Sequence, residues 1–279
     1  MRATLTVLGS GTSMGVPTIG CDCAVCTSAD PHDRRTRPSI MVEWDDPHPI
    51  VSTAGTPATP KRTVLIDTTP DFREQAIREQ IRRIDAVLYT HGHADHILGL
   101  DDVRPLSFPR ITGGGKIPLY ASESTSRTLR NVFRYIFEAD YKYGGLAQVE
   151  LRPVTSPIEL FGARFTPVVV MHGDVPIDGY RFGRAAYLTD FSRVPEESLA
   201  QLEGLDILFL DALRHHPHPT HSTVENSLKI VERLKPRRTF FTHISHDLAH
   251  EQTNAALPEN VRLSHDGLKL EFELSGTGL

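Results

Sequence analysis

Six consecutive residues, His91-Gly92-His93-Ala94-Asp95-His96, place three imidazoles and one carboxylate on a single short segment. The segment follows the apolar run 86–90, which is typical of a buried strand, so its polar side chains should lie on the loop that leaves the strand. Such a loop can direct His91 and His93 at one point and Asp95 and His96 at a second point nearby. Imidazole and carboxylate donors suit Zn, Mn, Fe or Ni, and two adjacent ions of this kind form a hydrolytic centre. The alternative interpretation is a histidine-rich surface loop.

A two-metal centre needs more donors than one loop supplies, and three further candidates each follow a short apolar run. His172 follows the run 165–171, Asp190 follows the run 185–189, and His243 follows the run 239–242. Loops at strand ends carry chemistry on a rigid scaffold, although each residue taken alone is incidental more often than not. Together they predict that Asp190 bridges two ions. The remaining donors would divide into His91, His93 and His172 on one ion, and Asp95, His96 and His243 on the other.

Every cysteine of the chain lies in the segment Cys21-Asp22-Cys23-Ala24-Val25-Cys26. Three thiolates in a C-x-C-x-x-C loop can wrap one ion and need one more donor to complete a tetrahedral structural site. His246, three residues after His243, is the candidate fourth donor. The alternatives are a disulfide with one spare thiol, or three unrelated small apolar side chains; the odd number of cysteines argues against the disulfide.

A third cluster of histidines occupies residues 215–221, where Pro217 and Pro219 forbid a helix and predict a stiff loop. His221 immediately precedes a helical pattern, for which we expect Ser222 as the N-cap and Glu225 as its capping-box partner. The other three histidines of this loop, His215, His216 and His218, are expected to face solvent or substrate.

At this point the chain resembles the metallo-β-lactamase superfamily. The resemblance extends from residues 3–8 to residues 268–272, and Asp67 matches the aspartate that this superfamily carries ahead of its metal loop. Ala94 stands where flavodiiron proteins of the same fold carry a glutamate, which argues against reduction of oxygen or nitric oxide. The resemblance implies metal-ligand roles for seven residues: His91, His93, Asp95, His96, His172, Asp190 and His243.

Two further motifs narrow the resemblance to the phosphoribosyl cyclic phosphodiesterase family of the carbon–phosphorus lyase pathway. Gly15-Val16-Pro17 runs into the cysteine loop, and residues 243–246 read H-I-S-H. The resemblance implies a structural zinc on Cys21, Cys23, Cys26 and His246, and it implies that His221 protonates the leaving oxygen. The pyrroloquinoline-quinone biosynthesis protein B has a similar cysteine loop but lacks an intact H-x-H-x-D-H motif, so the intact motif favours the phosphodiesterase.

These observations predict a metal-dependent phosphodiesterase that acts on a small cyclic or nucleotide-like diester. Two divalent ions, Zn or Mn by expectation, would turn a bridging water into hydroxide near neutral pH, with Asp95 and His221 as the catalytic side chains. An imidazole titrates near neutrality and therefore suits proton donation to a leaving alkoxide. The alternatives are an ester, thioester or lactone hydrolase of the same fold, or a non-catalytic cofactor-biosynthesis protein.

The elements that must position these residues alternate between short apolar strands and amphipathic helices, and they suggest two duplicated halves. We expect helices over residues 71–81, 124–136, 195–202 and 223–234. The pattern fits a single α/β domain over residues 1–279, a four-layer αββα sandwich with the metals along one sheet edge. Residues 45–61 read as an exposed hairpin excursion. Residues 105–145 carry the aromatic run Phe133, Tyr135, Phe137, Tyr141 and Tyr143, which indicates either core packing or a substrate lid.

Composition restricts the partners. The 279 residues carry 30 Lys and Arg against 35 Asp and Glu, a net charge of −5 without a basic run, which argues against binding of long nucleic acid. No apolar stretch reaches the roughly 18 residues of a membrane span. Free thiols without a secretory signal predict a reducing, cytoplasmic compartment. A small phosphodiester is the expected partner, and relatives suggest a homodimer.

Overall fold

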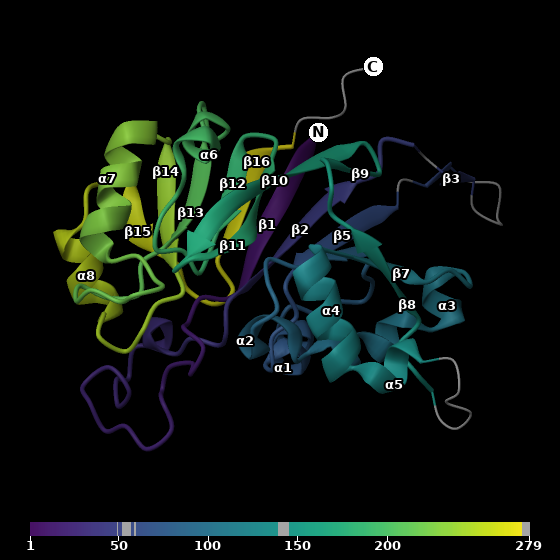
Figure 1. The fold of residues 1–279 in the computed structure, drawn as a ribbon, viewed down its shortest axis with the longest axis horizontal. Helices are drawn as coiled ribbons and strands as arrows, with labels where there is room; N and C mark the ends of the chain where they lie inside the picture. The colour runs from purple at the N-terminus through teal and green to yellow at the C-terminus, as the bar shows by residue number, and fades with distance from the viewer. Residues whose placement is uncertain (49, 52–56, 59, 139–144, 275–279) are drawn as a thin grey trace.

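The computed structural model describes residues 1–48, 50–51, 57–58, 60–138 and 145–274, and its main feature is a pair of seven-stranded sheets (Figure 1). The first sheet has the strand order β16-β1-β2-β5-β6-β7-β8 and the second has the order β15-β14-β13-β12-β11-β10-β9. The strands of the first sheet are β1 (Arg2–Gly9), β2 (Ser39–Asp45), β5 (Lys61–Ile66), β6 (Ala86–Leu88), β7 (Ile117–Ala121), β8 (Val149–Pro153) and β16 (Lys269–Glu273). Those of the second sheet are β9 (Ile158–Leu160), β10 (Ala163–His172), β11 (Val175–Phe182), β12 (Ala185–Leu188), β13 (Ile207–Asp211), β14 (Arg238–Thr242) and β15 (Val261–Leu263).

The two sheets repeat the same pairing pattern, as the duplicated halves of the sequence suggest. In the first sheet β16, β1, β2 and β5 pair antiparallel, and β5, β6, β7 and β8 pair parallel. In the second sheet β9 to β12 pair antiparallel, and β12 to β15 pair parallel. Each sheet therefore has a parallel half, whose strands all end at the same edge.

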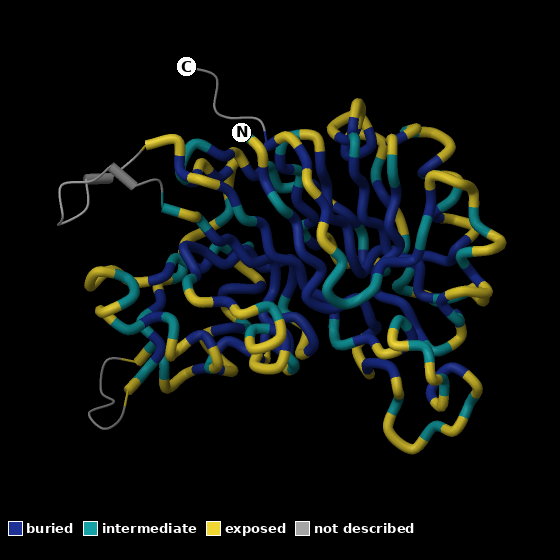
Figure 2. Tube along the Cα trace, turned by 180° about the vertical axis from the view of Figure 1, so that it is seen from behind, coloured by how far each residue is buried: buried dark blue, intermediate teal, exposed yellow. Residues whose placement is uncertain are grey.

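Apolar side chains fill three layers of contact, and this confirms the predicted αββα sandwich. Between the sheets, Leu5 and Trp44 of the first pack with Phe165, Phe182 and Phe209 of the second. Each of these side chains is almost completely removed from water, which stabilises the fold by about 1.5–3 kcal/mol per side chain. Two further clusters fill the outer faces, beneath α1 (Phe72–Arg78), α2 (Ala94–Ile97) and α4 (Glu123–Val132) on the first sheet and beneath α6 (Glu196–Ala200) and α7 (Val224–Leu234) on the second. Figure 2 shows the buried interior running through both sheets.

The four predicted helical segments lie close to their expected positions, with two corrections. In addition, Asp95 and His96, which were expected on a loop, lie in a short helix, α2 (Ala94–Ile97). The segment 124–136 is two helices, because Phe133 leaves helical geometry (φ −107°, ψ 41°) where its ring enters the core. The N-cap of α7 is Thr223, whose side chain accepts a hydrogen bond from the Asn226 amide, whereas the Ser222 hydroxyl bonds with Ser227. The helices are η1 (Pro31–Asp33), α1 (Phe72–Arg78), α2 (Ala94–Ile97), η2 (Leu100–Ser107), α3 (Pro109–Thr112), α4 (Glu123–Val132), α5 (Arg134–Phe137), α6 (Glu196–Ala200), α7 (Val224–Leu234) and α8 (His250–Ala256).

Two predicted excursions lie partly outside the described residues. Within 45–61, the short strands β3 (Ile50–Val51) and β4 (Pro57–Ala58) pair antiparallel, as a hairpin requires, and residues 49, 52–56 and 59 are outside the description. Within 105–145, Phe133 packs in the core and Tyr135 is exposed, while Tyr141 and Tyr143 lie outside the described residues, so the lid stays a prediction. Among the helices described, none is both long and apolar enough to cross a bilayer.

Candidate active site

The polar residues predicted to act together gather where strands of both sheets end. Asp67 follows β5, His91 follows β6 after a two-residue connection, and His172 ends β10. Asp190 and His243 follow β12 and β14. Three of these residues, Asp67, Asp190 and His243, have left-handed backbone conformations with φ of 67°, 56° and 57°. A non-glycine residue in this region costs about 1–3 kcal/mol, and such residues cluster at functional sites.

Four buried side chains form the first candidate metal position, Asp95, His96, Asp190 and His243. Nε2 of His96 lies 3.3 Å from Oδ2 of Asp95 and 3.2 Å from Oδ1 of Asp190. Nε2 of His243 lies 3.6 Å from Oδ2 of Asp95 and 3.2 Å from Oδ2 of Asp190. Ligands about 2.0–2.1 Å from a tetrahedral ion would lie about 3.3–3.4 Å apart, so the spacing fits one cation at the centre of these atoms.

Three imidazoles form the neighbouring half of the site. Nε2 of His91 lies 2.9 Å from Nδ1 of His93, and the ring of His172 lies 5.6 and 5.0 Å from these two rings. Nδ1 of His172 contacts the Asp190 carbonyl oxygen at 2.6 Å, which leaves Nε2 of His172 free for an ion. Oδ2 of Asp190 is 3.8 Å from Nε2 of His91. Because the same carboxylate borders both halves, it has the position that a bridging ligand needs.

The electrostatics of the site favour added positive charge. Burial disfavours a charged imidazole, yet the carboxylates of Asp190, Asp95 and Asp67 outweigh it and hold the pKa of His96 well above its usual value. Burial likewise opposes charge on His243, but Asp190 and then Asp95 raise its pKa to about 10. Oδ2 of Asp95, Nε2 of His96 and both ring nitrogens of His243 are buried without a hydrogen-bond partner among the described residues. A divalent cation would satisfy Oδ2 of Asp95 and the Nε2 atoms of His96 and His243 while the imidazoles stay neutral, so the donor set fits a metal.

A second row of residues fixes the orientation of the candidate ligands. Asp67 contacts Nδ1 of His96 at 2.7 Å and accepts hydrogen bonds from the amide and the hydroxyl of Thr90, both at 2.8 Å. The Thr90 hydroxyl also lies 3.0 Å from Nδ1 of His91. Partners of this kind fix the tautomer and direction of a ligating imidazole. Asp67 was identified from the sequence, whereas Thr90 was missed because a threonine after a strand has no distinctive signal.

His221 lies against the site beside an aspartate that sequence reasoning missed. Nδ1 of His221 contacts Oδ2 of Asp211 at 2.8 Å, and Asp211, at the end of β13, is completely buried. The His221 ring is 4.9 Å from His172 and stacks on His243 at 4.5 Å. Of the other histidines in this loop, His215 pairs with Glu225, and the ring of His218 lies 4.9 Å from His221. The place of Asp211 at a strand end, like Asp190, was the available signal.

The three cysteines converge on His246. Nδ1 of His246 is 3.2, 3.5 and 3.4 Å from the sulfur atoms of Cys21, Cys23 and Cys26. Thiolate and imidazole ligands of one tetrahedral zinc would lie about 3.6 Å apart, so the four donors can surround one ion. The amide of Cys26 donates to the sulfur of Cys23, and chiefly for this reason the pKa of Cys23 falls to about 7. All three thiols are free, which excludes the disulfide alternative in this structure.

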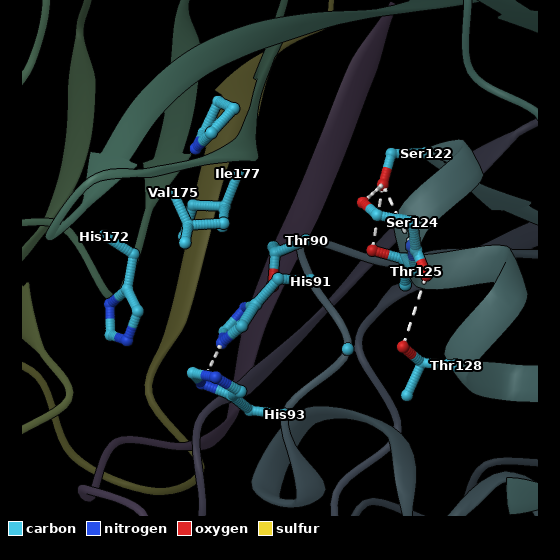
Figure 3. A pocket seen from close by; sticks show the side chains of 12 residues that line it. Thr90, His91, His93, Ser122, Ser124, Thr125, Thr128, His172, Val175 and Ile177 are labelled. Carbon is cyan, nitrogen blue, oxygen red and sulfur yellow. Dashed lines mark hydrogen bonds between the residues drawn. The ribbon is translucent and has the colours of Figure 1, made fainter.

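A cavity of about 210 Å³ opens beside the three imidazoles (Figure 3). His91, His93 and His172 line one side of it, and the start of α4 lines the opposite side. The candidate metal site is therefore open to a small molecule from this direction.

Comparisons with known proteins place this geometry in a family. Residues 62–244 match the model of the β-lactamase superfamily domain. The crystal structure of a diphosphatase from the PhnP family is 66% identical in sequence, covers 99% of both chains and has a TM-score of 0.89. Zinc-bound PqqB from Methylobacterium extorquens covers 96% of this chain and 99% of its own with a TM-score of 0.71, but at 21% identity that likeness shows the fold alone.

One curated relative is longer than this chain. An octanoyltransferase of Porphyromonas gingivalis is 34% identical over 274 residues, which make up 97% of this chain and 52% of that protein. The chain therefore spans about half the length of this relative.

Proposed function

Because the chain belongs to the β-lactamase superfamily and, within it, to the PhnP family of hydrolases, we propose that it is a metal-dependent phosphodiesterase acting on a small cyclic or nucleotide-like diester. The observation that carries the proposal is the position of seven imidazole and carboxylate donors in two adjoining halves that share Asp190, beside the Asp211–His221 pair. We assign two divalent ions, zinc or manganese, to the seven donors, and one structural zinc to the three cysteines and His246.

The residues of the site have separate roles in the proposed hydrolysis. Asp190 holds the two halves of the site together, and Asp95 completes the half that contains His96 and His243. Bound divalent ions would supply the positive charge that lowers the pKa of a water molecule and neutralises phosphate oxygens. His221, held by Asp211 through Nδ1, keeps a proton available on Nε2 for the leaving oxygen.

His221 has a second candidate role that the experiment must separate from the first. One of its ring nitrogens lies within 4.8 Å of ligand atoms of His172 and Asp190, so the side chain could itself ligate an ion. We favour the acid role because Asp211 already engages Nδ1 and because the seven other donors supply both halves of the site. A ligand variant loses metal together with activity, whereas an acid variant keeps its metal.

A second candidate reaction, hydrolysis of a diphosphate, is favoured by the relative at 66% identity, which is described as a diphosphatase. In both reactions a water-derived nucleophile attacks phosphorus and displaces a bridging oxygen, so the same residues serve either one. The octanoyltransferase relative points instead to acyl groups, but this chain corresponds to about half of that protein. Acyl transfer or hydrolysis is therefore an outcome of the test.

The first experiment measures hydrolysis of ribose 1,2-cyclic phosphate, of a nucleoside diphosphate sugar and of an acyl ester, with elemental analysis on the same sample. We expect about three metal ions per chain and turnover of a phosphorus substrate that is lost on chelation and in His93→Ala. His48→Ala, which removes an exposed histidine far along the chain from every donor, is the control. A fully metallated protein that cleaves the acyl ester and neither phosphorus substrate would refute the proposal.

A further inference from the structure

The cavity beside the metal site has three chemically different walls, and Figure 3 shows two of them facing each other across the opening. One wall is the row of imidazoles, and the second is apolar and comes from the start of β11. The third wall, which we call the hydroxyl ledge, consists of Ser122, Ser124, Thr125 and Thr128 at the start of α4.

Two members of the hydroxyl ledge maintain the helix, and two are available to a ligand. Ser122 caps α4 by accepting from the Thr125 amide, and its hydroxyl also donates to Oγ1 of Thr125. Ser124 is exposed and bonds only with the Ser122 hydroxyl among the described side chains. Thr128 is half-buried and donates to the Ser124 carbonyl at 3.2 Å, which leaves its oxygen free to accept. Ser124 and Thr128 are four residues apart and therefore share one face of α4.

The hydroxyl ledge lies directly against the loop that carries His91 and His93. A Cβ atom at Gly92 would lie 3.0 Å from both Cβ and Oγ1 of Thr128, closer than ordinary packing allows. The glycine between the two histidines thus lets the loop pass over Thr128. A molecule held at phosphorus by the metal site can consequently reach Thr128 with its adjoining group.

The cavity selects its occupant by charge and by shape. None of the described residues that line it is Lys, Arg, Asp or Glu, so it offers no ion pair to a second phosphate. The apolar wall includes Val175, which is 59% exposed, and the almost buried Ile177. These side chains suit the C–H face of a ring, while Ser124 and Thr128 suit its hydroxyl groups.

We propose that this cavity is a sugar subsite, in which Ser124 and Thr128 bind the hydroxyl groups of an uncharged pentose or hexose ring attached to the scissile phosphate. The proposal rests on the proposed phosphohydrolase function. It adds that the sugar is the part of the substrate that the protein recognises, and that Ser124 and Thr128 recognise it. It assigns substrate selection to α4 and β11, not to the metal ligands.

The test compares ribose 1,2-cyclic phosphate with ethylene phosphate, which has the same reacting five-membered ring but no further hydroxyl. Ser124→Ala and Thr128→Val should each lower kcat/KM for the ribose substrate by about threefold to tenfold, the effect of one neutral hydrogen bond. Hydrolysis of ethylene phosphate should not change. Thr112→Val is the matched control, because Thr112 donates to a carbonyl four residues earlier in the same way and lies outside this cavity.

Each outcome is decisive. Unchanged kinetics on both substrates, or equal losses on both, would overturn the sugar subsite and leave the phosphodiesterase standing. Failure of the parent protein on both substrates would count against the proposed function instead. In that case calorimetry with ribose 1-phosphate and with inorganic phosphate still tests the subsite: ribose 1-phosphate should bind more tightly, and Thr128→Val should abolish the difference, whereas equal binding of the two anions to the parent protein would overturn it.

Discussion

Asp211→Asn keeps the shape of a buried side chain and removes its charge, and it is expected to slow cleavage of a diester with an alkoxide leaving group by about two to three powers of ten. Oδ2 of Asp211 lies 2.8 Å from Nδ1 of His221, and the carboxylate is completely buried. Unit charges about 4 Å apart at an effective dielectric constant of about 20 interact by about 4 kcal/mol, so loss of the carboxylate should reduce the proton-donating form of His221 by up to about three powers of ten. The amide side chain of the variant still accepts a hydrogen bond from Nδ1 of His221 and so keeps part of this interaction energy. For this reason the expected range begins at two powers of ten.

The assay compares two leaving groups under single-turnover conditions and determines the metal content of each sample. An alkoxide needs a proton from His221, whereas 4-nitrophenolate leaves without one, so Asp211→Asn should slow a 4-nitrophenyl diester by less than about tenfold. His221→Ala should lose about two to four powers of ten on the alkyl diester, and the double variant should lose little more. Asp206→Asn, which breaks an exposed ion pair with Arg184 just before β13, is the control.

Two results would refute this reasoning. Equal losses with both leaving groups would show that Asp211 does not act through proton donation. Loss of a metal ion in Asp211→Asn or His221→Ala would place the pair among the ligands, as the approach of His221 to His172 and Asp190 allows.

Three further predictions concern stability. Burial raises the pKa of Asp178 from 3.8 to about 6, so the stability that its protonated form contributes is fully present below about pH 3.8 and is lost as pH rises through about 6. Asp178→Asn should therefore raise the free energy of unfolding in urea by about 1–3 kcal/mol over the parent at pH 7. This gain should vanish toward pH 4. His246→Ala should remove one metal ion per chain, as measured by elemental analysis, and should lower Tm by about 5–10 °C. The reason is that it opens the site at which the cysteine loop is anchored, at a cost of about 2–3 kcal/mol. An unchanged metal count would contradict the structural site. Gly99→Ala should destabilise the fold by about 3 kcal/mol or more, because the new Cβ would lie 2.0 Å from the Thr69 carbonyl oxygen, whereas Gly115→Ala meets nothing closer than 3.8 Å and should be nearly neutral in calorimetry.

The sequence was most informative where chemistry is concentrated in a few adjacent residues. The H-x-H-x-D-H segment and the cysteine loop each bring several donors together locally. The structure gathers the three cysteines with His246, and Asp95 and His96 with Asp190 and His243. His91 and His93 lie beside His172. Reasoning failed where a role depends on a neighbour from elsewhere in the chain. Asp211 contacts His221, and Thr90 contacts Asp67 and His91. Asp211 does lie at a strand end, but no local pattern indicates which residue either side chain contacts.

Local signals also failed where packing decides the backbone. The amphipathic pattern over 124–136 favours one helix, but burial of the Phe133 ring in the core cluster ends α4 there. At the start of α7, Ser222 and Thr223 are equally good caps by residue type. The structure uses Thr223 because the Ser222 hydroxyl bonds with Ser227, whose own hydroxyl donates to the Asp211 carbonyl. A contact between α7 and the end of β13 therefore selects the cap.

The two sheets contribute to the site in different ways, and this difference explains why half of it has no local signature. The first sheet delivers four donors through the loop after β6 and the short helix α2 that follows it, whereas the second delivers His172, Asp190 and His243 singly, from the ends of three strands. Only the strand order makes these three converge, because β10, β12 and β14 run in the same direction and end at the same edge of the sheet. Asp190 and His243 then turn into the site through left-handed backbone, which a side chain resists unless the surrounding packing holds it there. The rigid edge of the second sheet therefore brings together three residues that are far apart in the sequence, whereas the residues of the H-x-H-x-D-H segment are brought together because they are adjacent in the sequence.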